Sequence, residues 1–150
     1  MKKFPERELV VKIDTCFSYF NSSALPVPKA VEDRYYWLHK LAPFAIVAHN
    51  SEEDPHFIYA NHAALTYFKY SNKEFLKLPS RLSVTIHESK ERQHLLDKVK
   101  REGIVYQYTG IRINKMNQSF LIQDGVIWQL FDLKNKTIEG LAALFYVESP

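Results

Sequence analysis

Histidines and acidic residues gather between residues 49 and 62, and side chains of these types bind divalent metal ions. The members are His49, Glu52, Glu53, Asp54, His56 and His62. A metal site needs at least two ligands on rigid elements that converge, supported by neighbouring side chains. Here the acids occupy a turn closed by Asp54 and Pro55, and acidic turns are commonly just solvated. We therefore expect no metal site, although convergence of His49 and His62 stays open.

Motifs that carry catalysis are absent from the sequence. It has no nucleophile elbow, no HExxH segment and no cysteine–histidine pair at a recognisable spacing. The chain contains only four glycines, which leaves no room for a glycine-rich phosphate loop. We therefore predict no catalytic residues and a protein that is not an enzyme. An acid and a base that are distant in the sequence and meet only in the folded chain are not recognised from motifs, so a small cavity enzyme stays open.

Composition narrows the class of protein further. The chain has 150 residues and a formal net charge of +3, and its lysines and arginines are interleaved with acids. Such mixing is typical of a solvated surface, so we expect no nucleic-acid partner. The single cysteine, Cys16, excludes an internal disulfide. No stretch approaches the ~18 apolar residues of a membrane span, and the N-terminus becomes charged too early for a signal peptide. These features predict a cytoplasmic protein with no membrane partner.

An amphipathic helix is expected at the N-terminus. Pro5, followed by two glutamates, is typical of a helix start, and the breaker-rich segment 21–28 ends the helix. We assign residues 1–28 to this helix and its linker, and residues 29–150 to the main domain. Apolar side chains recur at helical spacing and form a stripe made of Leu9, Ile13, Cys16, Phe17 and Phe20.

The main domain combines short helices with five candidate strands. A helix is expected over residues 31–42, and further helices begin at Asn61 as a cap and at the capping box formed by Ser71 and Glu74. The last two run over residues 61–68 and 71–78, and a charged helix over 88–102 is closed by Gly103. Strands are expected over residues 44–49, 57–61, 105–113, 119–131 and 138–147. The economical arrangement is an α+β fold, a five-stranded antiparallel sheet with helices inserted after its second strand.

The strand 119–131 is apolar on both faces. Its odd positions carry Leu121, Ile127 and Phe131, while its even positions form an apolar face made of Phe120, Ile122, Val126, Trp128 and Leu130. A sheet with a partly apolar second face needs a second cover. The N-terminal stripe is the candidate for that cover, from its own chain or from a partner's.

Three segments carry a resemblance to a known family. APFAIVAHN, IYANHAAL and YSNKEFLKLPSRLS, followed by the closing three-strand run, resemble the MEKHLA domain family, a branch of the PAS-like fold. The resemblance covers Asp33 to Glu148. It implies a sensory or regulatory module, known from free bacterial proteins and from the C-terminus of plant class III homeodomain–leucine zipper factors. With only about thirty residues upstream of the match, the chain is similar to the free bacterial form.

The resemblance also implies a pocket between the sheet and the inserted helices. Arg81 and Ser83 lie in the segment that lines such pockets, and a buried arginine requires a carboxylate or phosphate partner. Tyr108 and Arg112 share one face of their strand, and Trp128 lies on the next strand. We predict these five residues as ligand contacts. For Arg81 an internal salt bridge or an exposed loop position stays open, and for Trp128 core packing does.

The resemblance does not identify a cofactor. Flavin photosensors of the LOV type carry a cysteine in the segment that corresponds to LPSRLSV, which has none, so we expect Cys16 to be a small core or interface residue. Haem sensors use a histidine on the long helix, where His87 and His94 lie. His94 is predicted to face solvent, away from the buried side marked by Leu95, Leu96 and Val99. A flavin photo-adduct and haem are therefore both disfavoured.

The sequence as a whole predicts a non-catalytic sensory module. We expect it to bind a small-molecule ligand or a regulatory protein, and to form a homodimer through the packing helix that carries Leu9, Ile13, Phe17 and Phe20. An adaptor with a solid core is the alternative from another class. A ligand can signal only by binding two arrangements of the protein unequally, and two packings of the N-terminal helix are the simplest pair.

Overall fold

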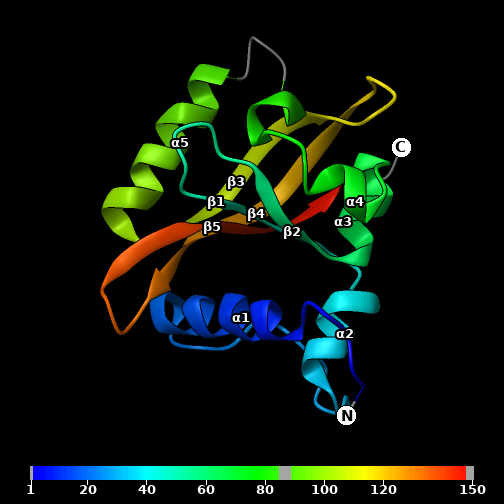
Figure 1. The fold of residues 1–150 in the computed structure, drawn as a ribbon, viewed down its shortest axis with the longest axis vertical. Coiled ribbons are helices and arrows are strands. Elements are labelled where there is room, and N and C mark those ends of the chain that lie inside the picture. The colour runs from blue at the N-terminus through cyan, green and yellow to red at the C-terminus, as the bar shows by residue number, and fades with distance from the viewer. Residues whose placement is uncertain (1, 85–88, 148–150) are drawn as a thin grey trace.

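A five-stranded antiparallel sheet in the order β2-β1-β5-β4-β3 forms the centre of the protein (Figure 1). The computed structural model describes residues 2–84 and 89–147, so the positions of His87 and Glu148 lie outside the described residues. The strands are β1 (Ala45–Asn50), β2 (Phe57–Ala60), β3 (Ile104–Ile113), β4 (Ser119–Asp132) and β5 (Thr137–Val147). The first and last strands are paired, because β1 lies between β2 and β5. The predicted fold class is confirmed.

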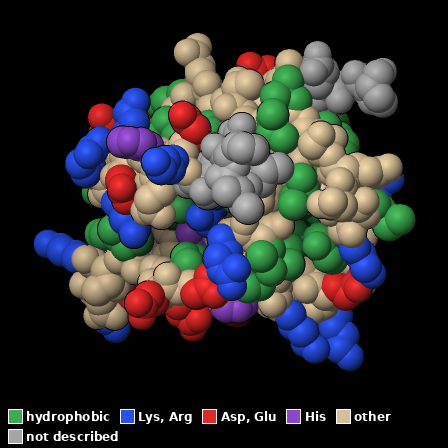
Figure 2. Space-filling model, turned by 90° about the horizontal axis from the view of Figure 1, so that it is seen from above, with side chains coloured by type: hydrophobic (Ala, Val, Ile, Leu, Met, Phe, Trp, Pro, Cys, Tyr) green, Lys and Arg blue, Asp and Glu red, His purple; other side chains and the backbone are tan. Residues whose placement is uncertain are grey.

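Helices cover both faces of this sheet (Figure 1). One face carries α1 (Arg7–Asn21) with α2 (Arg34–Lys40) beside it; the other carries α3 (His62–Phe68), α4 (Asn72–Phe75), the 3-10 helix η1 (Ser80–Ser83) and α5 (Ser89–Glu102). The helix predicted to reach Leu78 stops at Phe75, and the chain continues in turns, with the Leu78 N–H donating to the Phe75 carbonyl at 3.0 Å. Seen from the α5 side, basic and acidic side chains are interspersed over the surface (Figure 2). In the described part of the chain, no helix is both long and apolar enough to cross a membrane.

The α1 helix covers the sheet of its own chain. Ile13 and Phe17 are buried, and the Trp128 indole donates a hydrogen bond of 3.1 Å to the Ile13 carbonyl. The ring of Phe17 meets Trp128 edge-on, with 4.9 Å between ring centroids. Cys16 packs in the same cluster, its Sγ 3.5 Å from the Phe131 carbonyl, and burial raises the pKa of its thiol. The expectation of a core cysteine is met, and the cover predicted for the second face comes from α1 itself.

A bulge in β4 corrects the prediction that its even positions form one face. The register against β5 shifts between Gln123 and Val126, and Asp124 adopts a φ of +51°. One extra residue in a strand reverses the alternation of side chains beyond it. Before the bulge, Phe120 and Ile122 face α3 and α4; after it, the even positions Val126, Trp128 and Leu130 face α1, and Ile127 faces α5.

Asn61 is a fully buried side chain that joins three elements. Its Oδ1 accepts hydrogen bonds from the backbone N–H groups of Ile46, at 2.9 Å, and of Ala64, at 3.0 Å. Its Nδ2 donates to the carbonyls of Leu38 and Phe44, both at 3.0 Å. The predicted cap of α3 is confirmed, and the same amide also ties the end of α2 to the start of β1.

Replacing Asn61 with alanine is expected to destabilise the protein by about 3 kcal/mol or more. Four buried backbone groups lose their partner at once, and each buried polar group without a partner costs about 1–3 kcal/mol. The matched control is Ser71→Ala, which removes the exposed cap of α4 and should cost only about 1 kcal/mol. Urea unfolding measures both, and equal losses would show that Asn61 is an ordinary cap.

His39 at the end of α2 holds the N-terminal segment against the fold. Its Nδ1 lies 2.6 Å from the Tyr59 hydroxyl, and its Nε2 faces the Glu6 carboxylate at 3.6 Å. The ring of Phe4 stacks on the imidazole with 4.6 Å between centroids. Burial lowers the pKa of His39, with Glu6 opposing the shift, and burial raises the pKa of Tyr59. These shifts favour an uncharged phenol and an uncharged imidazole in the pair.

This burial predicts a loss of stability in mild acid. Because the pKa of His39 in the folded protein lies below its ordinary 6.5, the unfolded chain takes up the proton first as the pH falls. The contribution of the neutral imidazole is complete above about pH 6.5 and declines below it, towards the folded-state pKa. Melting temperatures at pH 7.5 and 5.5 should fall less in His39→Gln than in the parent protein. His94→Gln, at an exposed position, is the control and should leave the difference between the two melting temperatures unchanged. If the melting temperature of His39→Gln falls as much as that of the parent, the acid sensitivity does not come from His39.

Candidate functional site

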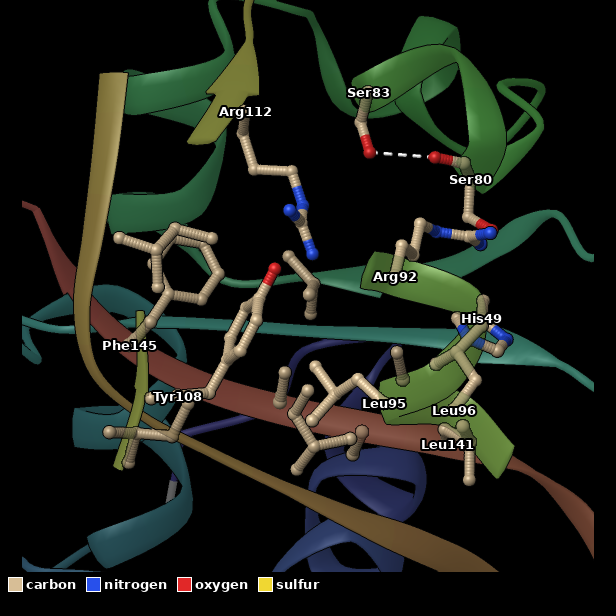
Figure 3. Close-up of a pocket in the computed structure, with 18 of the residues that line it drawn as sticks. His49, Ser80, Ser83, Arg92, Leu95, Leu96, Tyr108, Arg112, Leu141 and Phe145 are labelled. Carbon is tan, nitrogen blue, oxygen red and sulfur yellow. Dashed lines mark hydrogen bonds between the residues drawn. The ribbon is translucent and has the colours of Figure 1, made fainter. Parts of the chain in front are cut away.

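A cavity of about 60 Å³ lies on the face of the sheet opposite α1 (Figure 3). All five strands, α3, η1 and α5 contribute its walls. These are mainly apolar and include Val47, Phe57, Phe68, Leu95, Leu96, Ile122, Ile127, Leu141, Ala143 and Phe145. Pockets for drug-sized ligands measure about 300–1,000 Å³, so this cavity suits a much smaller molecule.

Polar side chains from four separate elements reach the same cavity. They are His49 of β1, Ser80 and Ser83 of η1, Arg92 of α5, and Tyr108 and Arg112 of β3 (Figure 3). The two serines are held in place by η1, where the Ser83 hydroxyl donates to the Ser80 carbonyl at 2.7 Å. A few polar groups that converge on an apolar cavity are typical of a small-molecule site.

The two arginines give the cavity a positive end. Arg92 is partly buried and donates a hydrogen bond to the Ser80 hydroxyl. Burial lowers the pKa of the Arg92 guanidinium, and the charge of Arg112 lowers it further. The Arg112 guanidinium lies over the Tyr108 ring, 5.3 Å from its centroid, and donates to its neighbour's carbonyl, Ile111, at 3.1 Å. Two like charges therefore share one site.

The titratable groups around this cavity are basic or phenolic. Among the residues that the structure describes, neither an aspartate nor a glutamate contributes to its walls. Among residues 2–84 and 89–147, no carboxylate forms an ion pair with Arg92 or Arg112. His49, the remaining titratable base, hydrogen-bonds the Asn50 carbonyl through Nδ1 at 2.7 Å, and burial lowers the pKa of its imidazole. The described site therefore combines guanidinium, hydroxyl and imidazole groups with apolar walls.

Two glycines make room for Tyr108. A Cβ at Gly110 would overlap the Tyr108 hydroxyl, and a Cβ at Gly125 would lie 3.0 Å from the Tyr108 carbonyl oxygen. The Tyr108 ring thus lies across Gly110 towards Arg112, which is two residues further along the same face of β3 (Figure 3). Bulges on both sides of Tyr108 set this orientation.

The structure brings together three of the five predicted ligand contacts. Ser83, Tyr108 and Arg112 line the cavity. Arg81 lies outside it: its side chain is 59% exposed and pairs with Asp54 at 3.1 Å, the exposed alternative left open by the sequence. Trp128 also lies outside, because the bulge in β4 turns it towards α1, where it packs in the core.

Arg92 and His49 line the cavity but were not predicted as ligand contacts. Arg92 precedes Leu95 and Leu96 by three and four residues, so helical spacing places it on the same face as these two leucines. That spacing is a signal that the sequence offered. His49 had been weighed only as a metal ligand, and no pattern in the sequence directs it to the cavity.

The histidines between residues 49 and 62 do not converge. His49 lines the cavity, whereas His62 lines a separate surface pocket with Glu6 and His39. His56 turns back to the Asp54 carbonyl at 2.8 Å. Throughout the part of the chain that the structure describes, no three metal-binding side chains come together. The open possibility of a His49–His62 pair is corrected, because β1 and α3 direct the two rings to different places.

Comparison with known proteins gives a family and a fold. The family model described as "MEKHLA domain" matches residues 13–148, while none of the curated proteins matches the sequence. The structure is similar to the PAS domain of a protein from Colwellia psychrerythraea, with a TM-score of 0.67 and 14% identity over 77% of this chain and 93% of that one.

Two light-sensing proteins share the same fold. A light-oxygen-voltage domain from work with a flavin analogue has a TM-score of 0.59 and 19% identity, over 70% of this chain and 77% of that one. The blue-light activated histidine kinase of Erythrobacter litoralis has a TM-score of 0.60 and 15% identity, over 72% of this chain and 34% of that one. At such identities the likeness establishes the PAS fold alone.

The residues of this chain do not fit a flavin photo-adduct or a haem. The only cysteine of the sequence, Cys16, packs on α1, across the sheet from the cavity. His94 is exposed on α5 and lies outside the cavity walls, as predicted from the helical spacing. A cavity of about 60 Å³ is also far too small for a tricyclic ring or a porphyrin.

Gly110→Ala is expected to destabilise the protein by about 1–3 kcal/mol, because the new methyl group must displace the Tyr108 side chain. In a Tyr108→Ala background that clash disappears, and the same glycine substitution should be nearly neutral. Urea unfolding of the two single variants and the double variant measures the coupling. Equal losses in both backgrounds would show that the glycine is needed for the strand and not for the tyrosine.

Proposed function

The chain belongs to the MEKHLA domain family, and we propose that it is a non-catalytic sensory module that binds a small molecule in the cavity between sheet and helices. The observation that carries this proposal is the convergence of polar side chains from β1, β3, η1 and α5 on one apolar cavity. An adaptor with a solid core does not need these polar side chains. Apolar side chains would fill the same space without the cost of removing polar groups from water.

The cost of the arrangement supports a binding role. Arg92 is partly buried beside a like charge, and His49 is partly buried as well, both of which oppose folding. Titratable groups that shift each other's pKa in a cavity are typical of functional sites. Such sites make the folded protein less stable than packing alone would allow. We attribute the presence of these unfavourable groups to a role in ligand binding.

A route from the cavity to the opposite face runs through β5. Leu141, Ala143 and Phe145 face the helices that enclose the cavity, while the alternating Ala142 and Leu144 pack in the cluster that contains α1. A ligand that presses on the first set moves the second with it, since both belong to one backbone. In the proposed mechanism the ligand binds one packing of α1 against the sheet more tightly than another, and the population shifts accordingly.

Self-association, a regulatory protein partner and a cytoplasmic location stay predictions. The stripe of Ile13 and Phe17 that was assigned to a dimer is buried against the sheet of its own chain, with Leu9 and Phe20 partly buried beside it. A homodimer would therefore use another surface. The exposed side of α1 offers Tyr19, whose side chain is 63% exposed.

Filling the cavity is expected to abolish binding while preserving the fold. Ala143→Leu places a larger side chain between the two clusters that border the cavity, and Ala30→Leu is the surface control. Thermal-shift screening of small metabolites, with native mass spectrometry of the freshly purified protein, should find compounds that raise the melting temperature of the parent and of Ala30→Leu but not of Ala143→Leu. The mass spectrum also reports the oligomeric state. Binding that survives the cavity-filling change would place the ligand elsewhere, turnover of a compound would indicate an enzyme, and a parent protein that binds nothing would favour the adaptor.

A further inference from the structure

We propose that the cavity binds a compact organic acid, with its carboxylate between Arg92 and Arg112 and a short apolar chain against the leucines of α5. This inference rests on the proposed function and names the class of ligand. It concerns the same cavity, whose polar end is formed by these two arginines together with Tyr108 and Ser83 (Figure 3).

Charge is the first reason for an anion. Burial lowers the pKa of the Arg92 guanidinium, and the charge of Arg112 lowers it further, while the charge of Asp54 opposes the shift. Arginine remains charged at any physiological pH. Among residues 2–84 and 89–147, no acid lines the cavity walls and none forms an ion pair with either side chain. A bound carboxylate turns the repulsion between two positive groups into two attractions, and it has two oxygens that planar guanidiniums recognise.

The orientation of the donors is the second reason. Arg112 comes from β3 and Arg92 from α5, and both line the cavity; the Arg92 guanidinium lies beside Ser80, and the Arg112 guanidinium lies near the Tyr108 hydroxyl (Figure 3). The Tyr108 hydroxyl is directed to the same space as the Arg112 guanidinium, held there by the lack of a side chain at Gly110. Hydroxyl and guanidinium groups are all donors to a carboxylate oxygen.

The remaining walls decide which anion fits. Leu95, Leu96, Leu141 and Phe145 offer contact surface to carbon and no hydrogen bonds from their side chains. A phosphate ion has four oxygens, and those turned away from the arginines would lose water against these side chains without replacement. A short monocarboxylate places its oxygens at the arginines and its chain on the leucines. The volume of about 60 Å³ restricts that chain to a few carbons.

Calorimetric titration with a homologous series of probes tests the inference. Acetate, butyrate and hexanoate are titrated into the 150-residue protein, with butyramide as a neutral isostere of butyrate and inorganic phosphate as an anion without a chain. We expect butyrate to bind at least tenfold more tightly than butyramide or phosphate, because charge-assisted hydrogen bonds are about twice as strong as neutral ones. Arg92→Gln and Arg112→Gln should each weaken butyrate at least tenfold.

Arg81→Gln is the matched control. It removes the same charge from the same region of the protein, but Arg81 is exposed and pairs with Asp54 outside the cavity. Butyrate affinity in this variant should stay within twofold of the parent. If all three substitutions weakened butyrate equally, the effect would be one of overall charge, and the inference would be overturned.

Stability without ligand gives a second readout that does not depend on choosing the right acid. Removing Arg112 relieves the repulsion on Arg92, so Arg112→Gln should keep or raise the melting temperature in a buffer without organic acids. A clear fall would assign the arginine to the structure and overturn the inference.

The outcomes separate this inference from the proposed function. Equal binding of butyrate and butyramide, or binding of phosphate alone, overturns the organic-acid inference and leaves a small-molecule site. The same holds if the probe series fails while the metabolite screen finds a different compound whose binding Ala143→Leu abolishes. If neither the series nor the screen yields a compound, both proposals fail.

Discussion

The buried amide of Asn61 is the interaction on which the arrangement of the domain depends. Its four hydrogen bonds connect the last turn of α2, the first residues of β1 and the first turn of α3. The backbone of Asn61 returns a further bond to the Ile46 carbonyl at 2.9 Å. The helices α2 and α3 lie on opposite sides of the sheet that contains β1, so one side chain sets how the N-terminal helices are placed relative to the helices around the cavity. An amide suits this position because it donates and accepts at once, whereas a carboxylate or an alkyl group cannot satisfy both.

The sheet itself separates two environments. On the α1 face the packing is dense, with Trp128 fully buried between α1 and the strands. On the opposite face the short elements α3, α4 and η1 and the longer α5 leave a cavity bordered by two smaller clusters. The bulge in β4 makes this division possible, because it gives large side chains to α1 on one side of Gly125 and to α3 and α4 on the other. A strand without it would have directed Trp128 to the cavity, leaving no space for a ligand.

The charges at the polar end of the cavity are unfavourable for folding, in contrast to the buried charges in the rest of the structure. Elsewhere buried charges are matched, as with Asp14, which accepts from Arg34 and from the backbone of Leu25. Arg92 and Arg112 instead share one cavity as like charges, and the Tyr108 ring is positioned beside them by two glycines. Two like charges in one cavity are unfavourable in the free protein, and under the proposed function a ligand of opposite charge offsets that cost.

Local sequence determined the elements of this protein, and only the tertiary structure decided which side chains meet. The stripe of α1, the caps at Asn61 and Ser71, the left-handed glycine Gly103 and the three closing strands are all patterns within a few residues, so the fold class followed from them. The composition of the cavity could not be predicted from local sequence. Its walls come from residues between 47 and 145, and which of them meet depends on bulges and turns that the hydrophobic pattern does not reveal. One extra residue in β4 turned Trp128 away from the cavity, and the η1 turn directed Arg81 to solvent while α5 brought Arg92 inward. Side chains alternate with a period of two along a strand, so a single bulge reverses every position beyond it, and that reversal is settled by packing across the sheet.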